Sequence, residues 1–405
     1  MNKAEFGEPG GDSGLQGELR RIEAVLRRLA RVSESAVIED VDRPGESRIF
    51  VCVVPTHAEL EGLPAGKRWQ SPNGLQMAVQ SRGEAAYFYE EIFERGCYLA
   101  DGAPLEDLEV VFDVGANIGM FTLFVASRCP RARIYAVEPA PLLIEHYERN
   151  VRIHGVGAEL FSCALAARPG TEVLTFYPHS SGMSSLVADF QEESEILVRH
   201  IEVARSRGQQ GIESLMDRLP EYLASRLTGL KTPVQVRTLS ALLDETGEDR
   251  VDLLKVDVQK SELKVLEGIH EEHWPVIRRI VLEVHDLHGR LEAVCSLLAS
   301  HGYTVTVDQD EVLEGTVLRT VHAYREGAGS AEVLYPVAEP VASLASQPVP
   351  VANDSLAREL RSCILSQLPK SGALWNLVLL DRLPRTPDGD VDQGWLLRFT
   401  RERDL

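Results

Sequence analysis

The chain has 405 residues, of which 44% are hydrophobic, and a formal charge of −20 at pH 7. This length favours about two or three domains, and the acidic excess argues against a phosphate-tracking surface for nucleic acid. No apolar run of about 18 residues predicts a membrane span, and the polar, glycine-rich residues 1–16 predict a disordered lead-in rather than a signal peptide. Six scattered cysteines without a CxxC pair argue against a disulfide scaffold or zinc site and favour a cytoplasmic location.

The first part of the chain predicts a small group of short elements. Residues 17–32 place apolar side chains on one helical face, and residues 35–41 and 48–55 are strand candidates on either side of a turn. Residues 68–80 indicate a hairpin around Asn73-Gly74, and residues 83–96 indicate a helix.

From about residue 108 onward, strands and helices alternate. Apolar runs separated by helical segments are typical of a parallel sheet covered on both faces, and a last pair of strands is spaced like a hairpin. We therefore predict a doubly wound α/β sheet that closes with an antiparallel hairpin. The strand candidates are residues 109–115, 133–139, 158–165, 251–258, 278–286, 303–310 and 317–324.

One interval is too long for a plain connection. About 85 residues separate Leu165 from Val251, and their pattern predicts a helical insertion over about 184–228. The Pro-, Ala- and Val-rich residues 326–353 indicate a linker. A helix over 355–368 and a strand over 376–383 follow.

The stretch VVFDVGANIGMF, residues 110–121, predicts a buried strand that ends at a glycine turn. The dinucleotide pattern GxGxxG fails because Asn117 and Met120 occupy its second and third glycine positions, and no GK[ST] follows. Asp113 lies two residues before Gly115, and a carboxylate beside the turn would repel phosphate and suit a cationic ligand. S-adenosylmethionine is such a ligand, and Glu138 at the end of the next strand could accept hydrogen bonds from its ribose.

Two later strands end in polar residues, where an open parallel sheet binds ligands. Asp257 ends one strand and Glu283, His285 and Asp286 end the other. We predict that His285 is the base that deprotonates a hydroxyl acceptor, with Glu283 or Asp286 behind it. Asp257 could contact the cofactor or the acceptor, or cap the following helix. A divalent cation held by Asp257 with Glu283 or Asp286 is the disfavoured alternative.

Residues 71–325 resemble the FkbM-type S-adenosylmethionine-dependent methyltransferases, mostly O-methyltransferases of natural-product pathways. The resemblance rests on VVFDVGANIGMFTLF, AVEPAP, DLLKVDVQKSELKVLEGI and VLEVHDLHGRL. In the family's D-V-E-G-x-E pattern this chain has Gln259 and Lys260 in place of the acid and the glycine. The resemblance implies a Rossmann-like class I methyltransferase fold and these cofactor-binding residues: Asp113, Gly115, Ala116, Asn117, Gly119, Glu138, Pro139, Cys163 and Ala164.

The flanks resemble pieces of the small C-terminal subdomain of nonribosomal peptide synthetase adenylation domains. The family's terminal L-P-x-T-P-N-G-K-V-D-R pattern here has Asp390 in place of the lysine. With this charge reversal and without a large ATP-binding part, we expect no adenylation. We predict that residues 17–58 and 354–405 form one small split α/β subdomain around a methyltransferase domain at 59–325. The subdomain would dock a carrier protein or synthetase, or serve only as a stabilising platform.

Together these features predict O-methylation of a peptide or polyketide-like natural product, either free or tethered to a carrier protein. N- or C-methylation on the same scaffold is one alternative. A noncatalytic partner of a synthetase that has kept only the fold is the other.

Overall fold

The computed structural model describes residues 15–26, 28–29, 31–43, 46–56, 58–99, 108–208, 212–325, 354–365, 374–380, 383–386 and 388–402. The predicted lead-in lies outside these ranges except for Leu15 and Gln16, which begin the first helix, and the predicted linker lies outside them entirely. The chain divides into two compact units. Unit 1 holds the described residues of 1–62, 70–75 and 342–405, and unit 2 those of 63–69 and 76–341.

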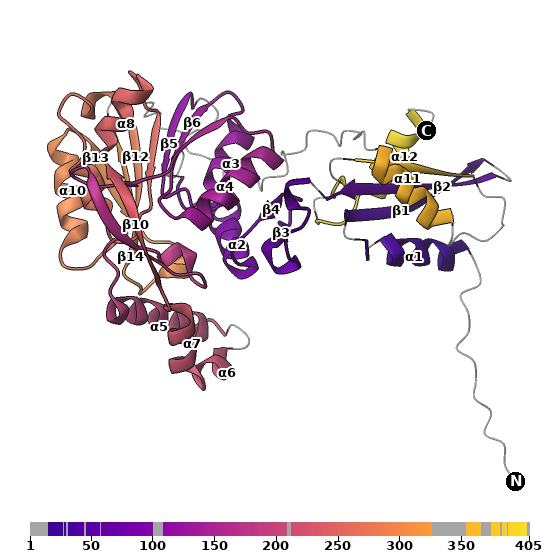
Figure 1. Cartoon of the computed structure of the whole chain (residues 1–405), viewed down its shortest axis with the longest axis horizontal. Helices are drawn as coiled ribbons and strands as arrows, with labels where there is room; N and C mark the ends of the chain where they lie inside the picture. Colours follow the sequence, from indigo (N-terminus) through magenta and orange to yellow (C-terminus); the bar gives the residue numbers. More distant parts are fainter. Residues whose placement is uncertain are drawn as a thin grey trace, which may run out of the picture. The chain divides into compact units, whose positions relative to one another are not determined.

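Unit 1 brings the two ends of the chain into one three-stranded sheet of order β1-β2-β15 (Figure 1). Its elements are α1 (Leu15–Leu26), β1 (Val32–Arg43), β2 (Glu46–Pro55), α11 (Asp354–Leu365), β15 (Leu374–Leu379) and α12 (Gln393–Glu402). β1 is antiparallel to β2, and β15 is parallel to it. Successive strand residues point to opposite faces, so Val51 packs in the cluster that contains α1 and α11 residues, while Phe50 packs in the cluster that contains α12 residues.

Unit 2 is built around a seven-stranded sheet of order β13-β14-β12-β11-β5-β6-β7. The strands are β5 (Val110–Val114), β6 (Arg133–Val137), β7 (Ala158–Phe161), β11 (Leu253–Val256), β12 (Arg279–His285), β13 (Thr304–Asp308) and β14 (Leu318–Tyr324). β5, β6, β7, β11 and β12 run parallel, and β14 is antiparallel to both β12 and β13. This arrangement confirms the predicted doubly wound sheet with a terminal antiparallel hairpin.

The chain order of the sheet reverses between β5 and β11. The strands progress outward from β5 through β6 to β7, and the chain then returns to place β11 on the other side of β5. Such a switch point opens a crevice at the carboxyl ends of the strands. The strands beside it are buried along their whole length, β5 with five and β11 with four buried residues, as expected for a sheet covered on both faces.

The remaining elements of unit 2 connect or cover this sheet. The helices are α2 (Arg82–Tyr89), α3 (Met120–Arg128), α4 (Pro141–Ile153), α8 (Leu239–Thr246), α9 (Glu262–Leu266) and α10 (Arg290–Ser300). The predicted hairpin over 68–80 is β3 (Arg68–Gln70) with β4 (Gln76–Ala78). The predicted helix over 83–96 is α2 followed by a π-helical turn, Glu90–Glu94.

The long interval after β7 is only partly helical. The strand predicted over 158–165 breaks after Phe161, and Ala164–Leu165 (β8) joins a second sheet with β9 (Gly170–Phe176) and β10 (Leu230–Arg237). Between β9 and β10, the cap helices α5 (Phe190–Ser206), α6 (Ile212–Met216) and α7 (Leu219–Arg226) project beyond the sheets (Figure 1). The prediction of a helical insertion therefore missed the strand pair that carries it.

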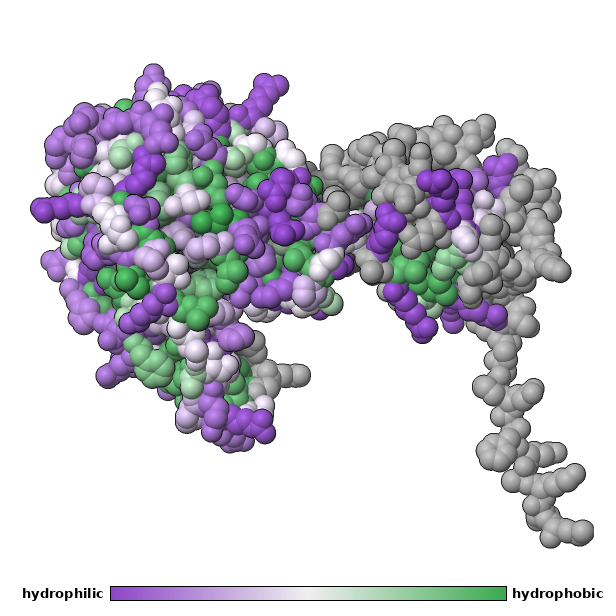
Figure 2. All heavy atoms as spheres, in the orientation of Figure 1, coloured by the Kyte–Doolittle hydropathy of each residue, from purple (hydrophilic) through white to green (hydrophobic). Residues whose placement is uncertain are grey.

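In the view of Figure 2, hydrophilic side chains cover most of the described surface of unit 2, with hydrophobic residues in scattered patches. This agrees with the high net charge. Among the described residues, no helix combines the length and the apolar character needed to cross a membrane.

Candidate functional site

A cavity of about 640 Å³ lies at the carboxyl ends of the parallel strands of unit 2. It is lined by residues of the turn after β5, by the ends of β6, β11 and β12, by α2 with its π-helical turn, and by the cap helix α5. The predicted site residues that line it are Gly115, Ala116, Asn117, Glu138, Pro139, Cys163, Ala164, Asp257, Glu283 and His285. Asp113, Gly119 and Asp286 do not.

In the turn after β5, close packing and positive φ angles favour glycine at two positions. Gly115 has φ +80°, and a Cβ there would lie 1.8 Å from the Asp257 carbonyl oxygen. Gly119 has φ +88° and begins α3, and a Cβ there would lie 3.0 Å from the Tyr147 ring. Asn117 has φ +50°, a conformation that asparagine tolerates better than most residues. The turn can therefore fit between β6 and β11 while its backbone faces the cavity.

Glu138 holds this turn from the end of β6. Its Oε2 accepts a hydrogen bond from Asn117 N, and its Oε1 accepts one from Ala140 N, each at 2.9 Å. A carboxylate has about four acceptor positions, so two remain for a ligand in the cavity. Burial raises the pKa of Glu138 to about 7, although the backbone hydrogen bonds oppose this shift.

Asp113 does not face the cavity, contrary to its predicted contact with a cationic ligand. It is fully buried, accepts a hydrogen bond from Thr122 Oγ1 at 2.8 Å, and lies 3.2 Å from Lys255 Nζ. Lys255 also donates to Gly115 O at 2.8 Å. Burial opposes the charge of Lys255, but the nearby Asp113 and Asp257 raise its pKa. Asp113 and Lys255 therefore stabilise the turn, and Lys255 also lines the cavity.

Cys163 and Ala164 reach the cavity because β7 ends at Phe161 and the chain turns into β8. The Cys163 backbone N–H donates to Phe161 O at 2.9 Å. Burial raises the pKa of the Cys163 thiol to about 11, so this side chain is an uncharged lining group rather than a nucleophile.

Asp257 and Glu283 lie next to one another across the ends of β11 and β12. Gln259 Nε2 donates to Asp257 Oδ1 at 2.9 Å and to Glu283 Oε1 at 3.3 Å, and the Tyr98 hydroxyl donates to Asp257 Oδ2 at 2.9 Å. Burial, followed by the negative charge of Asp257, raises the pKa of Glu283 well above its ordinary value. Through its side-chain amide, Gln259 therefore links the two carboxylates.

His285 faces the cavity from the end of β12 and is 3% exposed. Its Nδ1 lies 3.7 Å from Oε1 of Glu262, a fully buried residue. His200 on α5 lines the same cavity, and burial, followed by the charge of His285, lowers the pKa of His200 to about 4. The predicted role of Asp286 is not supported, because alternation along the strand turns Asp286 to the opposite, exposed side. The carboxylate behind His285 is Glu262.

Glu91 is a cavity residue that the sequence did not reveal. It belongs to the π-helical turn, is 5% exposed and lines the cavity wall. Burial, followed by the charge of Asp257, raises its pKa to about 8. A π-helical turn is a common feature of functional sites, but the sequence of residues 83–96 gives only an ordinary helical pattern.

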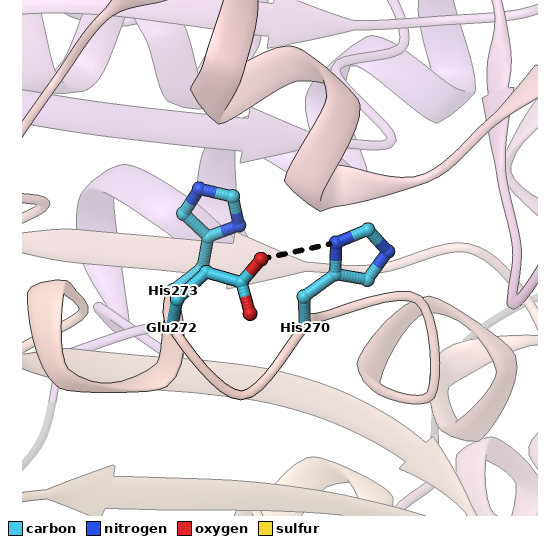
Figure 3. Close-up of side chains that lie close together, drawn as sticks. All are labelled: His270, Glu272 and His273. Atoms are coloured by element: carbon cyan, nitrogen blue, oxygen red, sulfur yellow. Dashed lines mark ion pairs between the residues drawn. The ribbon is translucent and has the colours of Figure 1, made fainter.

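One group of described residues has the composition of a metal site. His270, Glu272 and His273 place their ligand atoms within 4.8 Å of one another in a surface turn (Figure 3). His273 Nδ1 already lies 2.8 Å from Ser240 Oγ, and its Nε2 lies 3.3 Å from Asp244 Oδ1. Neither the group nor these neighbours line the cavity, so they have no part in its chemistry.

Solved structures with partial likeness include methyltransferase FkbM from Methylobacillus flagellatus and magnesium protoporphyrin IX methyltransferase from Synechocystis with bound SAM. The first has 12% identity and a TM-score of 0.37, and covers 58% of this chain and 48% of its own. The second has 10% identity and a TM-score of 0.31, and covers 60% of this chain and 83% of its own. These structural similarities are too low to support conclusions about the site.

Sequence relatives are more informative. The AMB antimetabolite synthetase AmbE of Pseudomonas aeruginosa is 34% identical over 398 residues, or 95% of this chain, and the chain spans only 18% of that synthetase's length. Methyltransferase sdnD of Sordaria araneosa is 34% identical, covering 57% of this chain and 86% of its own length.

A family profile and a third relative identify the family. Residues 113–305 match the profile described as methyltransferase FkbM domain. The 31-O-demethyl-FK506 methyltransferase FkbM of Streptomyces tacrolimicus is 38% identical over 254 residues, which cover 63% of this chain and 95% of that enzyme. The chain therefore belongs to the FkbM methyltransferase family.

Proposed function

We propose that the chain transfers a methyl group from S-adenosylmethionine to a hydroxyl of a peptide or polyketide-like natural product. The observation that carries the proposal is the Glu138 carboxylate, held by two backbone N–H groups on the wall of a cavity at the sheet's switch point. The name of the Streptomyces relative says that this enzyme methylates an oxygen of its substrate, which favours a hydroxyl acceptor here.

The residues present fit this cofactor. Glu138 has acceptor positions left for a ribose diol, the turn from Gly115 to Asn117 presents backbone to the cavity, and Cys163 with Ala164 supplies an uncharged wall. Lys255 lines the cavity but is already paired with Asp113, so it is not a free cation for a pyrophosphate. When bound, S-adenosylmethionine supplies an electrophilic methyl group.

His285 is the group best placed to remove the acceptor's proton. It lines the cavity, and Glu262 lies close enough to stabilise the imidazolium that forms. A base of this kind contributes roughly 10²- to 10⁴-fold to the rate of a proton-transfer step. Asp257 and Glu283, joined through Gln259, form the adjoining wall on the acceptor side.

The function is tested by incubating the chain with S-adenosylmethionine and candidate hydroxyl-bearing acceptors, free or attached to a carrier protein. Mass spectrometry should detect the gain of one methylene unit. His285→Ala should lower the rate by roughly 10²-fold or more without changing the affinity for S-adenosylhomocysteine. Unchanged turnover would remove His285 from the role of base and favour an acceptor that needs no deprotonation, such as an amine.

We also propose that unit 1 docks a carrier protein or synthetase. The support is that AmbE, a synthetase by name, matches 95% of this chain, which includes both flanks as well as the methyltransferase region. Faster methylation of a carrier-bound acceptor than of the same acceptor free in solution is the expected result. Equal rates would favour a purely structural role for unit 1.

A further inference from the structure

Three carboxylates from three separate elements border one side of the cavity. Glu91 comes from the π-helical turn, Asp257 follows β11, and Glu283 lies on β12. They are close enough that the charge of Asp257 contributes to the raised pKa values of both Glu91 and Glu283. This acidic wall (Glu91, Asp257 and Glu283) is separate from Glu138, which comes from the end of β6.

Two cations lie near the wall, and each also pairs with acids outside it. Lys255 Nζ lies 3.2 Å from Asp113 and 4.0 Å from Asp257. Arg95 pairs with Glu90 and with Asp310, each at 2.7 Å. Because burial raises the pKa of Glu91 to about 8, this residue holds a proton in the ligand-free chain at neutral pH, and a bound cation would favour its ionised form.

Glu91 is the member without a partner. Asp257 accepts hydrogen bonds from Tyr98 and Gln259, and Glu283 accepts one from Gln259. Only 5% of Glu91 is exposed, and within the described part of the chain its carboxylate makes no hydrogen bond or ion pair. The π-helical turn therefore holds Glu91 against the cavity, where a cationic ligand would give its carboxylate a partner.

We propose that the acidic wall binds a protonated amine carried by the methyl acceptor, so that the substrate class is an alcohol with a free ammonium group. This inference rests on the proposed function and adds a recognition element to it. Tyr87 lines the cavity near Glu91 and Glu283 and offers aromatic surface beside the ammonium group. The amine could also be that of the cofactor, and the experiment separates the two sources.

The test uses the full chain saturated with S-adenosylhomocysteine and two probes, tyramine and N-acetyltyramine, which share a phenol but differ in the ammonium charge. Isothermal titration at pH 7.0, where an alkyl ammonium is protonated, should show tyramine binding at least about tenfold tighter, the ratio expected for one charge-assisted hydrogen bond. Glu91→Gln should abolish most of this preference. Glu94→Gln, an exposed position on the same π-helical turn, is the matched control and should retain it.

Each of the other possible results has its own consequence for the proposal. Equal affinity for the two probes, or no binding of either, overturns the proposal. If Glu91→Gln weakens S-adenosylhomocysteine as strongly as tyramine, the wall binds the cofactor's amine and the acceptor assignment is wrong. If Glu91→Gln fails to fold by circular dichroism, Glu283→Gln replaces it with the same expected loss of preference. Failure of the unmodified chain to bind S-adenosylhomocysteine refutes the proposed function instead.

Discussion

Glu138 both shapes the glycine turn and faces the cavity, so its charge should control cofactor affinity. In Glu138→Gln the amide N–H₂ cannot accept the hydrogen bond that one carboxylate oxygen now receives from Asn117 or Ala140. We expect the affinity for S-adenosylhomocysteine to fall roughly 10- to 100-fold, the cost of an unpaired buried donor and a lost ligand contact. Titration calorimetry measures it, with Glu159→Gln on the exposed edge of β7 as control. An unchanged affinity would remove Glu138 from the binding site.

Glu91 should make the ligand-free chain less stable at alkaline pH. Its pKa is about 8 in the folded chain and 4.5 when unperturbed, so the folded state holds a proton that the unfolded state releases. The stabilisation is complete below about pH 4.5 and is lost as the pH rises toward 8. The unfolding temperature should therefore fall between about pH 5 and pH 8, and Glu91→Gln should reduce that decline. An equal decline in the variant would contradict the burial of an unpaired acid at this position.

Single residues marked the proposed cofactor end of the cavity better than its proposed acceptor end. Glu138 and the glycine turn could be located because each directly follows a strong strand pattern. Glu91 and Lys255 could not, because their roles come from contacts with distant segments: Lys255 lies among Asp113, Gly115 and the aromatic ring of Tyr98. The sequence correctly located Asp113 beside the glycine turn. It could not show that Lys255 pairs with Asp113, because that contact arises only when the strands pack into the sheet.

The loop after β11 shows how one element is held against the cap helix. Lys260 stands where the family has glycine, and it has φ +71°, a left-handed conformation that costs a side chain of this kind about 1–3 kcal/mol. Its Nζ lies 3.1 Å from Glu192 and 3.2 Å from Glu193 on α5. Tyr177 also donates to Glu193. This buried charge group joins the cap to the loop that carries Asp257.

Removing that cation should be destabilising. Lys260→Met leaves the buried Glu193 without its positive partner, and breaking such a pair typically costs about 3–5 kcal/mol. Lys260→Gly should be less damaging than Lys260→Met, because glycine relieves the strained φ. Urea denaturation measures the free energy of unfolding, and Lys231→Met on exposed β10 is the control. A loss for Lys260→Met no larger than that for Lys231→Met would contradict the role of Lys260 in joining the cap.

Elements were predictable where they form continuous patterns. The buried strands β5, β11 and β12 are apolar stretches in the sequence, and each lies within its predicted range. The break between β7 and β8 was missed because AELFSCAL is mostly apolar and has no glycine or proline to mark a turn. Only the pairing of Ala164 with β10 shows that the chain leaves the main sheet. Helix α12 was also missed, although Asp392 accepts a hydrogen bond from Trp395 N at its start, a recognisable capping signal.

At the scale of the whole molecule, each unit has its own hydrophobic core. In unit 1 the two faces of one sheet pack against helices from both ends of the chain, through residues such as Val51 and Phe50. In unit 2 one such cluster runs across β5, β11 and β12. Separate cores favour separate cooperative unfolding. Sequence motifs alone indicated that the two flanks belong together, but the parallel pairing of β15 with β2 gives that association its physical basis.

Calorimetry of the full chain should therefore show two unfolding transitions, of which one responds to the cofactor product. All residues that line the cavity belong to unit 2, so S-adenosylhomocysteine at about 100 times its dissociation constant should stabilise that unit alone, by about 2.7 kcal/mol. Glu138→Gln should reduce the shift, and Arg401→Gln on α12 of unit 1 should leave it unchanged. A single transition that moves as a whole with the ligand would contradict this, because it would require the two cores to unfold as one cooperative unit.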